Sequence, residues 1–280
     1  MQIKDLSGLS VHTLAECLNL AFSDYIIPLY VSAAQLGQKI IRERIVPSWS
    51  VGLFDGNRLV GFILHGQGKY LEKDALYNAG TGILPPYRGH GYTMAMYHHL
   101  LPKMQGANIS SVLLEVIDQN ERALKVYQKL GFKTVRAVDC LKGKIHSPKK
   151  IIHPNGFLLE EITKPQWELL AQCFDYSPTW QNDLPALLNG RSQNTIFQAR
   201  KDNKVAGYLI FSPRTFRIHS LGVLPVYRRQ GIATALLNTL PPGQWSIINI
   251  DQQNNSLLSF LQQQGWEKTI GQLEMVWHLS

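Results

Sequence analysis

The sequence predicts an α/β (α+β) protein that consists of two tandem domains of one fold. Two observations lead to this prediction: segments of the first half recur in the same order in the second half, and each half alternates strand-like and helix-like stretches. The chain has 280 residues, enough for two domains of ordinary size. Its 45% hydrophobic and 17% charged residues are typical of a globular protein that can bury two cores.

Three pairs of segments carry the repeat. They are 57–64 with 203–210, 82–96 with 222–236, and 120–132 with 254–266. The separation falls from 146 to 140 to 134 residues, so two loops of the first half are about six residues longer than their counterparts. A weaker match links 21–25 (AFSDY) with 173–177 (CFDYS). The repeat therefore covers nearly the whole chain.

The expected elements agree between the two halves. In the first half we expect a hairpin strand at 57–64, a strand at 75–84, a helix from His90 to about Lys103 that ends near Pro102 and Gly106, a strand at 111–117, a helix after Asn120, and a last strand at about 132–141. Asn120 is expected to cap its helix, and Gly131 to close it. The second half ends in a strand at about 266–279.

The charge distribution places the domain boundary. The segment 142–150 (KGKIHSPKK) reads as a basic linker, which predicts domains at 1–145 and 155–280. The net charge of +8 and pI of about 9.3 favour anionic partners, or else reflect a generally solvated basic surface.

The remaining composition points to the cytoplasm. Cys17, Cys140 and Cys173 are scattered and read as reduced, buried thiols. No apolar stretch is long enough to cross a bilayer and no signal peptide is apparent, so no membrane partner is expected. No metal site is expected, because His, Cys and carboxylate residues do not cluster at ligand spacing.

A strand, a proline, Tyr-Arg and a glycine turn that opens a helix occur at 83–97 and again at 223–237. The first N–H groups of a helix lack internal partners, and with the helix dipole they form an anion site that suits a pyrophosphate. Arg88, Arg228 and Arg229 add positive charge nearby.

These turns resemble the [QR]-x-x-G-x-[GA] motif of the GNAT superfamily of acyl-CoA N-acyltransferases. RRQGIA (228–233) matches it in full, and RGHGYT (88–93) departs from it only at Thr93. The segment 113–132 is similar to the family's downstream strand–helix signature, which runs through Asn, Ala, Tyr and a closing Gly-Phe. The resemblance implies in each domain a mixed, mostly antiparallel twisted sheet flanked by helices. It also implies transfer of an acetyl group from acetyl-CoA to a primary amine of a small molecule or peptide.

The resemblance further implies which residues hold acetyl-CoA. They are Ile83, Arg88, Gly89, His90, Gly91, Tyr92, Thr93 and Asn120 in the first domain, and Val223, Arg228, Arg229, Gln230, Gly231, Ile232, Ala233 and Thr234 in the second. Backbone amides of the two turns would bind the pyrophosphate, and Ile83 and Val223 would face the pantetheine arm.

Direct attack of an amine on a thioester needs a deprotonated amine, a polarised carbonyl and a proton for the departing thiolate. A phenol suits the last role because its pKa lies near that of a thiol. Tyr127, one turn before Gly131, is the expected general acid, although it could instead be a core tyrosine. Leu261 stands at the matching place in the second half, which favours catalysis in the first.

Glu115 is the leading candidate for the general base. Asp24, Tyr25, His65 and a chain of water molecules are the alternatives.

A non-catalytic module that senses CoA or binds nucleic acid is the second hypothesis, motivated by Leu261 and Thr93. Nucleic acid is the less favoured partner, because basic and aromatic residues do not interleave. A dinucleotide-binding fold is excluded, since Gly80 and Gly82 lead into Ile83-Leu84-Pro85 and not into a glycine that opens a helix. The acceptor and the oligomeric state are not specified by the sequence.

Overall fold

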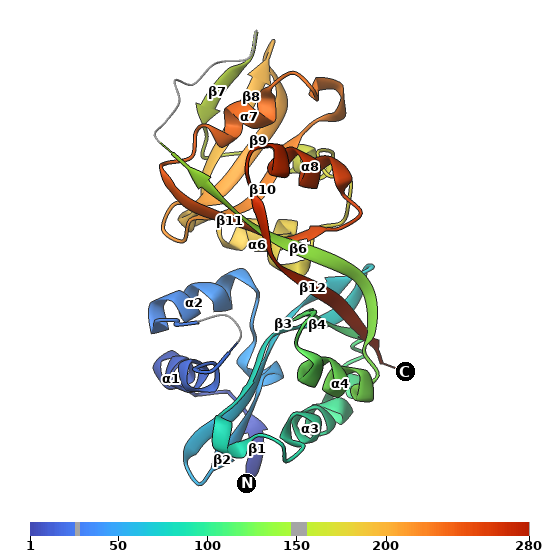
Figure 1. Cartoon of the computed structure of the whole chain (residues 1–280). Helices are drawn as coiled ribbons and strands as arrows, with labels where there is room; N and C mark the ends of the chain where they lie inside the picture. The colour runs from blue at the N-terminus through green and yellow to red at the C-terminus, as the bar shows by residue number, and fades with distance from the viewer. Residues whose placement is uncertain (26–28, 147–155, 280) are drawn as a thin grey trace. The chain divides into compact units, whose positions relative to one another are not determined.

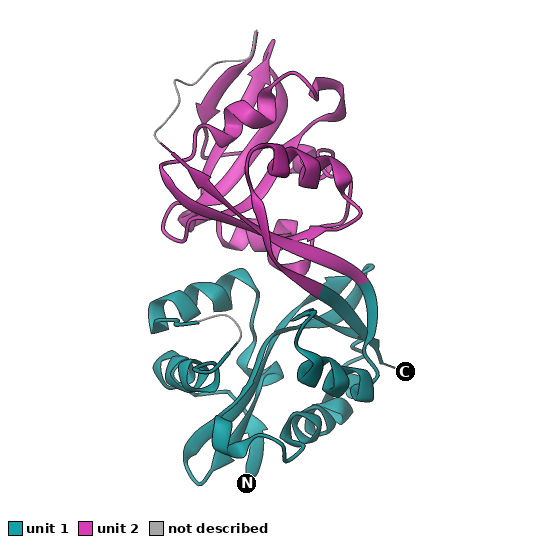
Figure 2. Ribbon diagram, in the orientation of Figure 1, with its two compact units in different colours: residues 1–135, 273–280 teal, residues 136–272 magenta. Residues whose placement is uncertain are grey.

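A computed structural model describes residues 1–25, 29–146 and 156–279 of the chain. The chain divides into two compact units, residues 1–135 with 273–280 (unit 1) and residues 136–272 (unit 2) (Figures 1 and 2). Among the described helices, none has both the length and the apolar composition that a bilayer crossing requires.

Unit 1 is a sheet with helices on both sides. Its elements are β1 (Gln2–Asp5), α1 (Val11–Ala21), α2 (Ala33–Arg42), β2 (Val51–Asp55), β3 (Arg58–Tyr70), β4 (Lys73–Ile83), α3 (Tyr92–Gly106), β5 (Ser111–Ile117) and α4 (Glu121–Leu130), with short 3-10 helices at Pro47–Trp49 and Pro85–Tyr87. The strand order is β1-β2-β3-β4-β5, with β12 (Glu267–His278) next to β5. In Figure 1, α1 and α2 lie on one side of β3 and β4, and α3 and α4 on the other.

Unit 2 repeats this plan. It contains most of β6 (Lys133–Ile145), then β7 (Leu158–Glu161), α5 (Trp167–Ala171), α6 (Leu184–Asn189), β8 (Thr195–Lys201), β9 (Lys204–Ser212), β10 (Arg217–Val223), α7 (Ile232–Leu237), β11 (Gly243–Asp251) and α8 (Asn255–Gln263), with 3-10 helices at Trp180–Asn182, Arg191–Gln193 and Pro225–Tyr227. Its strand order is β6-β11-β10-β9-β8-β7.

The predicted fold class is confirmed. Of the strand pairs with a defined register, β4–β5 and β10–β11 are parallel and the others antiparallel, so both sheets are mixed and mostly antiparallel. The caps of α4 follow the expectation: the Asn120 side chain accepts from the N–H of Ala123, and Gly131 ends the helix at φ 102°. The three cysteines are free and buried.

The predicted linker differs from the structure. Residues 136–145 belong to unit 2, where β6 pairs with β11 from Val138–Asp251 to Ile145–Gly243. Leu141 and Gly143 are buried and alternate with the exposed Lys142 and Lys144, a period of two that marks a strand. Residues 147–155, the rest of the expected linker, lie outside the described residues.

The C-terminal segment returns to unit 1. The Trp277 ring lies 5.7 Å from the Phe132 ring, and the N–H of Leu279 donates to the carbonyl of Ser110. A single boundary between residues 145 and 155 therefore does not separate the two units, because residues 273–280 belong to unit 1.

The helix α3 ends at Gly106, one of the two residues expected to mark its end, but it continues through the other, Pro102. Pro102 removes one intrahelical hydrogen bond, whose acceptor would be the carbonyl of His98. His98 and Pro102 are both exposed, so water can satisfy that carbonyl.

Candidate functional site

The two parallel strands of each unit, β4 with β5 and β10 with β11, pair only over their first few residues and then separate. In unit 1 the pairing of β4 with β5 ends at Tyr77–Leu113, although the strands continue to Ile83 and Ile117. A bulge at Ala79 shifts the register of β4 against β3 next to this opening. Bulges bend a strand and increase its twist, and they are common beside functional sites. The opening therefore lies in the middle of the sheet, where the chains of both strands border it.

Unit 2 has the same irregularities at matching positions. The bulge falls at His219, 140 residues after Ala79, and the pairing of β10 with β11 ends at Ile218–Ile247, one residue further along β10 than the counterpart of Tyr77. The registers therefore show that residues of β4 and β10 correspond at an offset of 140.

The turn that follows β4 opens α3 with unusual backbone angles. Gly89 and Gly91 have φ of 84° and 74°, a region that residues with a Cβ adopt at a cost. Gly91 is the N-cap of α3 and supplies no side-chain hydrogen bond, whereas α1 and α2 begin with serine caps. The first N–H groups of α3 are thus left for an external acceptor, as an anion site requires. The turn of unit 2 is alike, with Arg229 at φ 61° and Gly231 at φ 80°.

Arg88 is held by protein groups. Its guanidinium donates to the carbonyl of Ile83 at 3.0 Å, to the carbonyl of Ala21 at 2.8 Å, and to both carboxylate oxygens of Asp24 at 2.7 and 2.8 Å. These hydrogen bonds lower the pKa of Asp24 below its ordinary value. The side chain that the sequence suggested as extra charge therefore ties the end of α1 to the turn, an arrangement that we call the arginine clamp.

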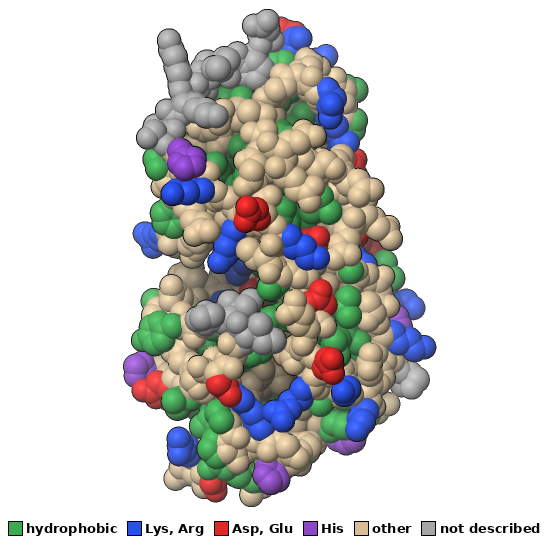
Figure 3. Space-filling model, viewed as in Figure 1, with side chains coloured by type: hydrophobic (Ala, Val, Ile, Leu, Met, Phe, Trp, Pro, Cys, Tyr) green, Lys and Arg blue, Asp and Glu red, His purple; other side chains and the backbone are tan. Residues whose placement is uncertain are grey.

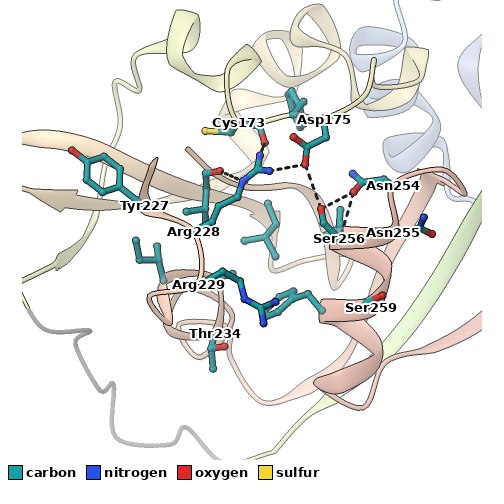
Figure 4. Close-up of a pocket in the computed structure, with 18 of the residues that line it drawn as sticks. Cys173, Asp175, Tyr227, Arg228, Arg229, Thr234, Asn254, Asn255, Ser256 and Ser259 are labelled. Carbon is teal, nitrogen blue, oxygen red and sulfur yellow. Dashed lines mark hydrogen bonds and ion pairs between the residues drawn. The ribbon is translucent and has the colours of Figure 1, made fainter. Parts of the chain in front are cut away.

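Unit 2 repeats the arginine clamp. Arg228 donates to the carbonyls of Val223 and Cys173 and to Asp175, at 3.0, 3.3 and 2.8 Å respectively. Asp175 also accepts from Ser256 of α8 at 3.3 Å, and Figure 4 shows these groups along one side of the cleft of unit 2. The weak similarity between 21–25 and 173–177 thus marks the carboxylate partner of each arginine.

A cleft of about 500 Å³ lies at the opening of unit 1. Most of the residues predicted for this unit line it: Ile83, Arg88, Gly89, Gly91, Tyr92, Thr93, Asn120 and Tyr127. The exceptions are His90, which is exposed on the turn, and Glu115. Arg122 and Lys129 of α4, which are not among the residues predicted for the site, line it as well.

The cleft of unit 2 has a volume of about 580 Å³. It is lined by all the residues predicted there except Gln230, namely Val223, Arg228, Arg229, Gly231, Ile232, Ala233 and Thr234. Ser256 and Gln263 stand where unit 1 has Arg122 and Lys129, so α8 lacks the two positive charges of α4.

Asn120 connects α4 to the end of α1. Its side-chain oxygen caps α4, and its Nδ2 lies 3.4 Å from the Tyr25 hydroxyl. Asn254 caps α8 in the same way and accepts from Ser256.

Four polar side chains meet beneath the cleft of unit 1 and form what we call the Asn78 cluster. Asn78 Nδ2 lies 2.8 Å from the hydroxyls of Thr81 and Tyr97 and 3.5 Å from that of Tyr127. Burial raises the pKa of Tyr127, and hydrogen bonds from Thr81 and Asn78 act against that rise. Of these residues the sequence identified Tyr127 alone. Two polar residues in an otherwise apolar strand, Asn78 and Thr81, are the signal that the sequence offers.

Every member of the Asn78 cluster has an aliphatic counterpart in unit 2. At the offsets of the repeat, the four positions are Ile218, Leu221, Leu237 and Leu261, all buried. The two units thus share their turn, clamp and cap but differ in the interior beneath the cleft.

Glu115 lies across the sheet from Tyr127. Successive side chains of a strand point to opposite faces. Asn78 reaches Tyr97 of α3 and Tyr127 of α4, while Tyr77 donates to Glu115 Oε2 at 2.5 Å. Burial, with the nearby Glu274, raises the pKa of Glu115 to about 8. Glu115 Oε1 has no hydrogen-bond partner within the described part of the chain.

The other residues considered as bases are placed less favourably. His65 is fully buried, burial lowers its pKa to about 4, and its Nδ1 lies 2.9 Å from the carbonyl of Trp49. Asp24 is bound in the arginine clamp, and Tyr25 lines the cleft beside Asn120.

A sequence profile of the acetyltransferase (GNAT) family matches residues 35–132 and 159–240 of the chain. No curated protein matches it. Among solved structures, a GCN5-related N-acetyltransferase from Sphaerobacter thermophilus is similar, with a TM-score of 0.74 at 13% identity over 99% of this chain and 95% of that one. A tandem GNAT protein from the clavulanic acid biosynthesis pathway gives a TM-score of 0.74 at 12% identity over 100% and 99%. A GCN5-related N-acetyltransferase from Anabaena variabilis gives 0.64 at 16% identity over 100% and 73%.

Proposed function

The chain belongs to the acetyltransferase (GNAT) family, and on that premise we propose that unit 1 transfers an acetyl group from acetyl-CoA to a primary amine. The observation that carries this proposal is the position of Tyr127, whose hydroxyl belongs to a buried hydrogen-bonded cluster and whose ring lines a cleft bounded by an anion-binding turn. The acceptor is a small molecule or peptide that presents an uncharged amine at the reaction centre.

The turn between β4 and α3 would hold the CoA pyrophosphate. The backbone N–H groups from Gly89 to Thr93 supply the hydrogen bonds, and the α3 dipole favours the negative charge. The arginine clamp supports this role indirectly, because it fixes the turn against the end of α1. Arg122 and Lys129 add positive charge to the same cleft for the anionic groups of CoA.

The transfer needs a base and an acid, and the two candidates flank the sheet opening. The amine nitrogen attacks the thioester carbonyl, a C–N bond forms, and the amine gives up one proton, which Glu115 takes through water because it does not line the cleft. The C–S bond then breaks, and Tyr127 gives its proton to the leaving sulfur. With a pKa of about 8, Glu115 is a strong base in its ionised form, and that form becomes populated as the pH rises toward 8. The raised pKa of Tyr127 keeps the phenol protonated until it is needed.

For unit 2 we propose acetyl-CoA binding without turnover. Its turn, clamp and cap match those of unit 1, which supports binding. Leu261 replaces the general acid and has no proton to donate, so the acyl group would stay on the thiol. The alternative of a nucleic-acid-binding module is less favoured, since in the face shown in Figure 3 the Lys and Arg side chains are scattered among Asp and Glu and do not gather in one patch.

The test is release of free thiol from acetyl-CoA across a panel of amines. Loss of a general acid costs 10²–10⁴-fold in rate, so Tyr127→Phe should lower kcat by about 100-fold or more while acetyl-CoA affinity changes little. The matched control is Tyr208→Phe, which removes a buried hydroxyl of unit 2 that donates to the carbonyl of Leu170. Equal turnover by Tyr127→Phe and the wild type would remove Tyr127 from the mechanism.

A further inference from the structure

We propose that Asn78 is a positioning residue that orients the Tyr127 hydroxyl for proton transfer to the leaving thiolate. The inference rests on the proposed role of Tyr127 as general acid. Asn78 is buried and does not line the cleft, whereas Tyr127 and Thr81 do, so Asn78 acts through these neighbours and does not contact the substrates.

The Asn78 side chain is itself fixed at both ends. Its Oδ1 accepts from the backbone N–H of Gly80 at 3.0 Å and lies 3.2 Å from the Thr81 hydroxyl. Its Nδ2 then faces the hydroxyls of Tyr97 and Tyr127, and the Thr81 oxygen lies within reach of both ends of the amide. The bond to Gly80 spans the bulge at Ala79, so the irregularity of β4 sets the direction of the amide.

This arrangement has a chemical consequence for the phenol. The Asn78 Nδ2, which carries two hydrogens, lies nearest the Thr81 and Tyr97 oxygens, at 2.8 Å each, which leaves the Thr81 hydroxyl hydrogen for the Tyr127 oxygen, with Asn78 itself 3.5 Å away. A hydrogen bond received there occupies a lone pair of the phenol oxygen and leaves its own hydrogen free to point into the cleft. The same donors stabilise the phenolate that remains after the proton has left. Burial alone would make Tyr127 a poorer acid, and the contacts with Asn78 and Thr81 oppose that effect. Asn78 therefore helps to orient the O–H group of Tyr127 and to limit the rise of its pKa.

The second unit shows that the fold does not require asparagine here. Ile218 occupies the matching place in β10, beside the matching bulge and with the matching register to β9. Ile218 and the counterparts of the other three members, Leu221, Leu237 and Leu261, all belong to one buried hydrophobic cluster. The Asn78 cluster is therefore present in the unit with a tyrosine at the acid position and absent from the unit with a leucine there. This is the distribution expected if the cluster serves the general acid.

The experiment combines Asn78→Ile, the residue that unit 2 uses, with Tyr127→Phe in a double-mutant cycle. We expect Asn78→Ile to lower kcat for amine-dependent thiol release by about 10- to 100-fold, with KM for acetyl-CoA within about twofold of the wild type. In the Tyr127→Phe background the same change should alter kcat by less than about twofold, because the group that it positions is already gone. A purely structural role would instead lower kcat by the same factor in both backgrounds.

The possible outcomes separate this inference from the proposed function. If the wild type turns over, Tyr127→Phe is impaired and Asn78→Ile behaves like the wild type, the role of Asn78 is refuted and the acetyltransferase stands. If the wild type releases no thiol with any amine, the proposed function fails and this inference with it. If Asn78→Ile does not fold, Thr81→Val replaces it in the same cycle. Equal factors in the two backgrounds would overturn the proposal for either variant.

Discussion

Glu115→Gln should change how the stability of the protein depends on pH, and this needs no knowledge of the acceptor. The pKa of Glu115 is raised from 4.5 to about 8 in the folded protein. Between these values the unfolded chain has released the proton that the folded chain still holds, so the wild type loses stability as pH rises from about 4.5 to 8. Glutamine cannot ionise and removes this loss.

The size of the effect follows from the two pKa values. One proton per pH unit corresponds to 1.36 kcal/mol, so from pH 5 to pH 7 the free energy of unfolding of Glu115→Gln should rise by about 3 kcal/mol relative to the wild type. Urea unfolding at a series of pH values measures this difference.

The matched control is Glu121→Gln, whose side chain is 79% exposed beside Lys125. This variant keeps Glu115, so it should retain the loss of stability that the wild type shows between pH 5 and pH 7. If the curve for Glu115→Gln also runs parallel to that of the wild type, Glu115 titrates as an ordinary carboxylate. Its assignment as a base that receives a proton near pH 8 would then be wrong.

Three further predictions concern the cleft. Arg88→Lys should weaken acetyl-CoA binding about as much as Arg88→Met, because lysine keeps the positive charge but cannot bind Asp24 and two backbone carbonyls at once. Isothermal titration measures the affinity, and an unchanged affinity of the lysine variant would show that Arg88 acts through its charge alone. Gly91→Val and Gly231→Val should each remove one of two acetyl-CoA sites, since valine is strained at φ of 74° and 80°, and a stoichiometry of two in either variant would contradict the assignment. With an amine of pKa below 6 as acceptor, kcat/KM of the wild type should rise with pH through about 8, as Glu115 loses its proton. The same rise should be absent from the pH profile of Glu115→Gln.

The features predicted correctly from the sequence depend on neighbours in the chain. The glycine turn before α3 and the Asn120 and Gly131 caps of α4 are set by residues within a few positions of one another, so a short motif contains their cause. The repeat adds long-range information only because the same motifs occur twice.

The features that were missed depend on contacts between distant residues. Arg88 was read as a free charge because its partner Asp24 lies 64 residues earlier in the chain. Asn78, Tyr97 and Tyr127 come from three elements, and no local pattern joins them. The last strand was assigned to the second domain because Trp277 packs on Phe132, which is far from it in the sequence, and no local pattern indicates that contact.

The central claim is that acetyl transfer takes place in unit 1 beside Tyr127. A crystal structure of the protein with acetyl-CoA tests it most directly. We expect pyrophosphate oxygens within hydrogen-bond distance of the N–H groups from Gly89 to Thr93, and the thioester sulfur in contact with the Tyr127 hydroxyl. Acetyl-CoA bound in unit 2 alone, or a sulfur in unit 1 that lies away from Tyr127, would contradict it.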